Sequence, residues 1–63
     1  MSDIHTTNTA ELLKVIHTRV PHGLFLAREG IKWAAVDNST GDAWTEIFAT
    51  RHAAIRWLRR KRM

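Results

Sequence analysis

The feature that most constrains the fold is a change of hydrophobic period at Pro21 and Gly23. Before Pro21, aliphatic residues recur at helical spacing, whereas after Gly23 aromatic and β-branched runs alternate with turn residues. Proline has no backbone donor and biases the preceding residue away from helix, so a helix that continues through this point is disfavoured. We therefore expect a helix before Pro21 and a sheet after Gly23.

The expected first helix begins at a capping sequence. Asn8-Thr9-Ala10-Glu11 has the form of a capping box, in which Asn8 accepts from the backbone of Glu11. The helix is predicted to end near Arg19. Residues 1–7 are polar without a period and are predicted to be disordered. The apolar arc of the helix consists of Leu12, Leu13, Val15, Ile16 and Val20.

Three strands are expected in the middle of the chain. Residues 24–28 and 31–37 are separated by Glu29-Gly30, a two-residue connection typical of tight hairpins. Residues 38–41, Asn-Ser-Thr-Gly, then separate the second run from residues 43–48. This order predicts a three-stranded antiparallel meander.

A second helix is expected to close the chain, with Thr50 as its N-cap and its end near Arg62. The prediction is one α+β domain over residues 1–63 in the order α-β-β-β-α, with residues 59–63 as a basic end that can fray. The expected core consists of Leu12, Ile16, Leu24, Leu26, Trp33, Ala35, Trp44, Phe48, Ala54 and Leu58.

The length of the chain argues against a self-contained enzyme. Sixty-three residues bury only about 60% of the unfolded surface, which leaves little room for an enclosed active site. The six acidic residues are scattered, no nucleophile stands near a base, and the four histidines lack metal-ligand spacing. We therefore expect no enzymatic activity, no catalytic residue, no metal, no cofactor and no small-molecule substrate.

The composition also bears on the compartment. The chain has no cysteine, which excludes disulfides and fits a reducing cytoplasm. No apolar run reaches the roughly 18 residues of a membrane span, and the first residues lack the order of a signal peptide. A cytoplasmic protein without membrane contact is expected.

Positive charge is concentrated at the C-terminal end. Residues 1–50 hold four basic and all six acidic side chains, whereas residues 51–63 hold six basic side chains and no acidic one. At 100° per residue, four cations share one arc of the second helix, which indicates either a solvated face that complements the helix dipole or a surface for nucleic-acid phosphates. The predicted phosphate-binding residues are His52, Arg56, Arg59, Arg60, Lys61 and Arg62.

Trp33 and Trp44 are the second notable feature, because they fall on adjacent expected strands and are placed to pair across the ladder. The two tryptophans are expected either to pack in the core beneath a helix or to form a face that binds another protein. Val36, Ala43 and Ile47 occupy the opposite faces of these strands, so neither face of the sheet is fully polar. A partner, most simply a second copy in a homodimer, would cover such a sheet.

The last 30 residues carry a pattern of spaced residues that resembles one in small uncharacterised proteins encoded by bacteriophages and prophages. The pattern consists of Trp33, Asp37-Asn38, Gly41, Trp44, Glu46, Phe48, Ala54 and Trp57-Leu58. It implies a shared fold and is silent on function.

The same stretch, through Lys32-Trp33-Ala34-Ala35, is more distantly similar to the APETALA/ethylene-response DNA-binding domain and to the amino-terminal domains of tyrosine integrases. Those domains consist of a three-stranded sheet and one helix, and they lay the sheet in the major groove. Here Val36 and Ala43 stand where those domains carry arginines. The order of elements also resembles that of the double-stranded-RNA-binding domain.

These observations favour a non-enzymatic accessory protein of phage or prophage type that binds nucleic acid through its C-terminal cations. The alternative is a protein-interaction or inhibitor module that binds through the Trp33 and Trp44 face.

Overall fold

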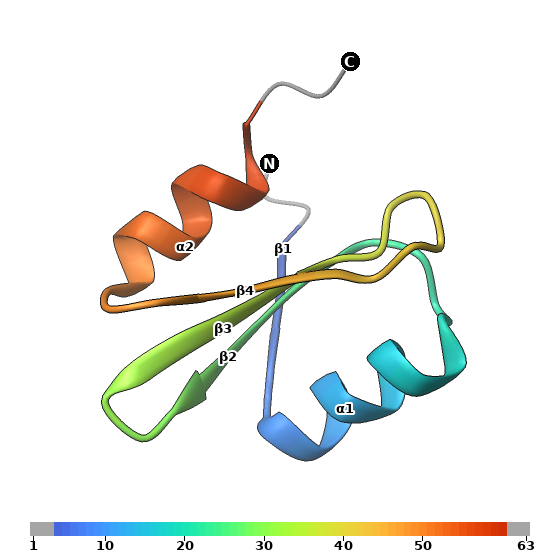
Figure 1. The fold of residues 1–63 in the computed structure, drawn as a ribbon, viewed down its shortest axis with the longest axis horizontal. Helices are drawn as coiled ribbons and strands as arrows, with labels where there is room; N and C mark the ends of the chain where they lie inside the picture. The colour runs from blue at the N-terminus through green and yellow to red at the C-terminus, as the bar shows by residue number, and fades with distance from the viewer. Residues whose placement is uncertain (1–3, 61–63) are drawn as a thin grey trace.

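The computed structural model describes residues 4–60, which form a four-stranded mixed sheet with one helix on each side (Figure 1). The strands lie in the order β1-β2-β3-β4; β1 is parallel to β2, and the other neighbours are antiparallel. The α+β class is confirmed. The predicted three-stranded antiparallel meander accounts only for β2–β4, because β1 adds a fourth strand that is parallel to β2. The elements are β1 (Ile4–Thr7), α1 (Thr9–Thr18), β2 (Leu24–Glu29), β3 (Lys32–Asp37), β4 (Trp44–Phe48) and α2 (Arg51–Leu58).

Strand β1 corrects the prediction that residues 1–7 are disordered, since residues 4–7 pair with β2 from Ile4↔Leu24 to Thr7↔Ala27. Residues 1–3 lie outside the described residues. The four-residue strand has no local signal strong enough to identify it, because its partner is 20 residues away in the sequence. Helix α1 supplies the crossover that a parallel pair of strands requires.

Helix α1 begins as predicted. Asn8 is its N-cap, and the side-chain Oδ1 accepts a hydrogen bond from the Glu11 backbone nitrogen at 2.9 Å. The helix ends at Arg19, whose φ of 64° is left-handed and whose N–H donates to the Val15 carbonyl. The Arg19 guanidinium then donates to the carbonyls of Gly41 and Asp42, which ties the end of α1 to the β3–β4 loop.

The hairpin between β2 and β3 is offset by one residue from its prediction. Glu29 and Lys32 are the last register pair, so the two-residue connection is Gly30-Ile31 and not Glu29-Gly30. Gly30 has a φ of 64°. This places glycine at the first loop position, where a tight hairpin favours positive φ.

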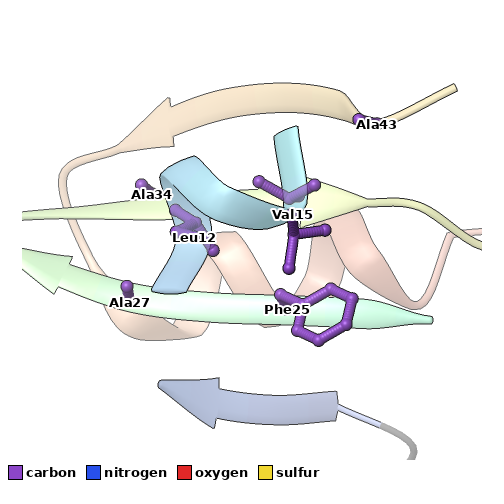
Figure 2. Packing of buried hydrophobic residues seen from close by; sticks show 7 residues of the cluster. Leu12, Val15, Phe25, Ala27, Ala34 and Ala43 are labelled. Carbon is purple, nitrogen blue, oxygen red and sulfur yellow. The ribbon is translucent and has the colours of Figure 1, made fainter. Parts of the chain in front are cut away.

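Helix α1 packs on one face of the sheet. Leu12 and Val15 lie over Phe25, Ala27 and Ala34 (Figure 2). Small alanines on β2 and β3 let the short helix approach the sheet closely. The buried residues of this cluster are Leu12, Val15, Phe25, Ala27, Ala34, Val36 and Ala43.

Helix α2 packs on the opposite face, where Ala54 and Leu58 meet Leu26 and Ala35. The apolar character of both sheet faces therefore reflects one helix on each face. The residues that are partly buried around this second cluster are Ile4, Leu24, Trp33, Phe48, Ile55 and Trp57.

The expected core is partly correct. Its strand residues all lie on the face beneath α2, so it lacks Phe25, Ala27, Ala34 and Val36, which are buried beneath α1. Trp44 is the error: its side chain is 62% exposed. Of the other expected residues, Leu12, Leu26, Ala35, Ala54 and Leu58 are buried, and Ile16, Leu24, Trp33 and Phe48 are half-buried.

Asn38 joins the two loops at one end of the sheet. Its side chain is fully buried, and its Nδ2 donates to the carbonyls of Arg19 and Pro21 at 2.9 and 2.8 Å. Its Oδ1 accepts from the backbone nitrogen of Ala43 at 3.1 Å. Both the nitrogen and the oxygen of this amide are therefore hydrogen-bonded, and they hold the α1–β2 loop against the β3–β4 loop.

Helix α2 begins at Thr50 as predicted, since Thr50 Oγ1 accepts from the Ala53 backbone nitrogen at 3.1 Å. It ends at Leu58 and not near Arg62, because Arg59 leaves helical geometry with φ −94° and ψ 4°. Residues 61–63 lie outside the described residues. Over residues 4–60, neither helix has the length and apolarity that crossing a membrane requires.

Candidate nucleic-acid interface on the last helix

The outer side of α2 carries exposed cations. His52 and Arg56 are one helical turn apart and exposed, and Arg59 is exposed at the C-cap. Among residues 4–60, no carboxylate lies within ion-pairing distance of Arg56 or Arg59. Arg51, which the sequence-based set omitted, is also exposed in the first turn. These side chains are therefore accessible to an external anion.

Arg60 is placed differently from the other predicted cations. Its Nη2 lies 3.5 Å from Asp37 Oδ2, and its guanidinium carbon lies 4.0 Å from the centroid of the Trp57 ring. Its Nη1 also donates to the Trp57 carbonyl at 2.7 Å. Because α2 ends at Leu58, Arg60 does not follow the helical line of Arg56 and turns back toward the sheet. Part of its charge is already neutralised within the chain.

Asp37 is the buried partner of this arginine. It is 2% exposed, and its Oδ1 accepts from both the backbone nitrogen and the hydroxyl of Ser39, at 3.1 and 2.7 Å. The sequence analysis did not identify Asp37 as a partner, although a carboxylate at the end of a buried strand is a signal that a cation is needed nearby. Asp37 and Arg60 together fasten the end of α2 to β3.

Replacing Arg60 with glutamine is expected to lower the free energy of unfolding by about 1–2 kcal/mol, because it removes a guanidinium from a buried carboxylate. The partial exposure of Arg60 keeps the expected loss at the low end of what a buried ion pair costs. Arg56→Gln is the matched control and is expected to change stability by less than about 0.5 kcal/mol. Urea unfolding followed by circular dichroism compares the two. Equal midpoints for both variants would show that the Arg60 contact contributes nothing.

A shallow groove runs along the flank of α2 and is lined by Ala53, Arg56, Trp57 and Arg60. Trp57 packs against Phe48 with ring centroids 5.8 Å apart and an interplanar angle of 46°. The indole is therefore held between Phe48 and the Arg60 guanidinium. The groove combines two arginines with an aromatic wall.

The two predicted interaction tryptophans lie on the same face of the sheet but do not pair. Trp33 is opposite Phe48, and Trp44 is opposite Asp37, so the indoles are at opposite ends of the β3–β4 ladder, about 13 Å apart along the strand. Trp33 is half-buried beneath α2, whereas Trp44 is exposed. The alternation of side chains along a strand correctly predicted that Trp33 and Trp44 share a face. The strand register nevertheless places their rings at opposite ends of the ladder.

A second hollow is lined by His5, Pro21, His22, Gly23, Leu24 and Phe25. His5 makes an edge contact with Phe25, with ring centroids 5.9 Å apart. Within residues 4–60, no three His, Asp or Glu side chains are grouped so that they could hold a metal ion.

The predicted cations Lys61 and Arg62 lie outside the described residues, so the site described here consists of His52, Arg56, Arg59 and the paired Arg60. The geometry gathers exposed positive charge beside an aromatic groove on one helix. Comparisons with models of known protein families, with characterised proteins and with solved structures found no match to this chain.

Proposed function

We propose that the protein is a non-enzymatic nucleic-acid-binding protein, of the small prophage-encoded type that its C-terminal pattern resembles, and that the cations of α2 contact phosphates. The observation that supports this most is the exposure of Arg56 and Arg59 without a carboxylate partner in the described part of the chain. Ala54 and Leu58 anchor the helix, so these charges are displayed on a fixed support. Lys61 and Arg62 follow Arg60 in the sequence and belong to the same predicted set of cations.

A purely structural role explains fewer of these cations. A helix dipole is complemented by one or two positive groups in the last turn, worth about 0.3–1 kcal/mol each. Arg56 lies in the last turn of α2 and satisfies that role. Arg59, at the C-cap, lies at the same end of the dipole, so with Lys61 and Arg62 the chain carries more cations here than a dipole requires. We propose that the surplus contacts phosphates.

The test is the salt dependence of binding in the double variant Arg56→Gln/Arg59→Gln. Each lost phosphate contact reduces the slope of log affinity against log salt by about 0.7–0.9, so the slope should fall by about 1.4–1.8. The loss should be similar on unrelated sequences, because phosphate contacts position a protein without reading bases. Glutamine is a good helix former, so folding should change little. Fluorescence anisotropy with a labelled oligonucleotide measures the slopes.

The matched control is Lys14→Gln/Lys32→Gln, which removes the same charge. Both lysines are exposed; Lys14 is on α1, and Lys32 shares the sheet face of Ala34 beneath α1. This variant should keep the parental slope apart from a small general charge effect. Equal slopes for the parent and both double variants would contradict the proposal.

A second candidate function is protein contact through the Trp-bearing side of the sheet, including self-association. It is favoured by Trp44, which is exposed on that face of the edge strand β4. Strand β4 is an edge of the sheet, so its unpaired backbone groups offer one place where a second copy could add. Sedimentation at micromolar concentrations should then show a species of twice the monomer mass, with little dependence on salt. A monomer throughout would contradict self-association.

A further inference from the structure

We infer that the nucleic acid bound by this protein is single-stranded and that one of its bases stacks on Trp44. The inference rests on the proposed phosphate contacts of α2 and adds the class of nucleic acid and a second binding residue. Trp44 begins the edge strand β4, and its side chain is 62% exposed. A tryptophan this exposed buries little of its apolar surface on folding and so adds little to stability. Its presence at this position therefore needs another explanation.

Trp44 lies beside the cationic groove of α2. It is the direct cross-strand partner of Asp37, so the two side chains share one face and their Cα atoms are about 5 Å apart. The carboxylate of Asp37 holds Arg60, and Arg60 lines the groove together with Arg56 and Trp57. The register and the ion pair therefore place an exposed aromatic ring next to the Arg60 guanidinium, which forms one wall of the groove.

Of the three tryptophans, Trp44 is exposed, whereas Trp33 and Trp57 are partly buried. Trp57 is covered by the Arg60 guanidinium on its ring and contacts Phe48. Trp33 is half-buried against the cluster beneath α2. Trp57 is accordingly a positioning residue for Arg60, whereas Trp44 faces solvent.

An exposed ring beside cations fits a single strand better than a duplex. In a duplex the flat faces of the bases are stacked internally, so an indole at the surface finds no ring to stack on. A single strand presents both phosphates and base faces, and proteins bind it with a positive groove and aromatic platforms, each stacked base contributing about 1–3 kcal/mol. Base reading in the major groove requires hydrogen-bonding side chains, whereas the exposed outward residues of β4 on this face are Trp44 and Glu46.

Glu46 provides an independent marker of the path of the strand. It is exposed, and it lies two residues from Trp44 on the same face. A phosphate backbone that passes from Trp44 toward α2 comes close to this carboxylate and is repelled by it. Glu46→Gln should therefore strengthen binding of a single strand, a gain that misfolding cannot produce.

The experiment uses the full chain, a labelled oligothymidine and a blunt mixed-sequence duplex of equal length, titrated by anisotropy at one salt concentration. Trp44→Ala should weaken binding of the single strand by about 5- to 150-fold, which corresponds to one lost stack. It should change duplex affinity less than twofold. Trp44→Phe should recover most of the loss. Ile47→Ala, at an exposed residue on the opposite face of the same strand, is the control and should bind as the parent does.

The outcomes separate this inference from the proposed function. The inference is overturned if Trp44→Ala binds the single strand as tightly as the parent, if it weakens both ligands equally, or if Glu46→Gln fails to strengthen single-strand binding. Salt-sensitive binding that still depends on Arg56 and Arg59 would then leave the proposed function standing. No salt-sensitive binding of either ligand would overturn both.

Discussion

Replacing Asn38 with aspartate is expected to lower the free energy of unfolding by about 3–5 kcal/mol. The amide nitrogen donates to the carbonyls of Arg19 and Pro21, and an aspartate would face the same two oxygens with a carboxylate oxygen. The site is fully buried, so the charge would have neither solvent nor a donor at that position. A domain of 63 residues has a total stability of only about 3–9 kcal/mol, so much of the population would be unfolded.

Asn8→Asp is the matched control for this prediction. It makes the same chemical change at the exposed N-cap of α1, where aspartate accepts the Glu11 hydrogen bond as well as asparagine does. Urea unfolding monitored by circular dichroism should give a midpoint close to the parent for Asn8→Asp and a greatly reduced one for Asn38→Asp. Similar midpoints for the two variants would show that the Asn38 amide does not hold the loops together.

Elements with local signals were predictable from the sequence. Asn8 and Thr50 cap the two helices as expected because a capping side chain bonds within three residues of itself. The turns near Gly30 and Asn38 were likewise located, with an offset of one residue at the first. By contrast, β1 was missed, because its stability depends on pairing with β2 across the length of α1.

The candidate site was predictable in composition but not in geometry. The sequence identified Arg56 and Arg59 as exposed cations, and both are exposed in the structure, Arg56 on α2 and Arg59 at its C-cap. The sequence-based prediction grouped Arg60 with Arg56 and Arg59, because it expected the helix to continue to Arg62. The early end at Leu58 turns Arg60 toward Asp37 instead, a contact between residues 23 positions apart that helical periodicity cannot detect.

A fragment that begins at Gly23 is expected not to fold cooperatively. It removes β1 and α1, and with them Leu12 and Val15, which cover Phe25, Ala27 and Ala34 on one face of the sheet (Figure 2). Each of these two aliphatic side chains contributes about 1.5–3 kcal/mol by burial. The fragment also removes the two carbonyls that accept from the buried Asn38 amide. The combined loss reaches the whole stability of a domain of this size.

A control fragment of residues 4–60 retains every described element and should unfold cooperatively near the parental midpoint. Thermal melts followed by circular dichroism compare the two fragments. The fragment that begins at Gly23 keeps a three-stranded sheet, β2–β4, and one helix, α2. A sharp transition in residues 23–63 at the parental midpoint would mean that the same unit is sufficient here and that α1 is dispensable. An uncooperative fragment would mean that β2–β4 and α2 require α1 as a third layer, because their second face is as apolar as their first.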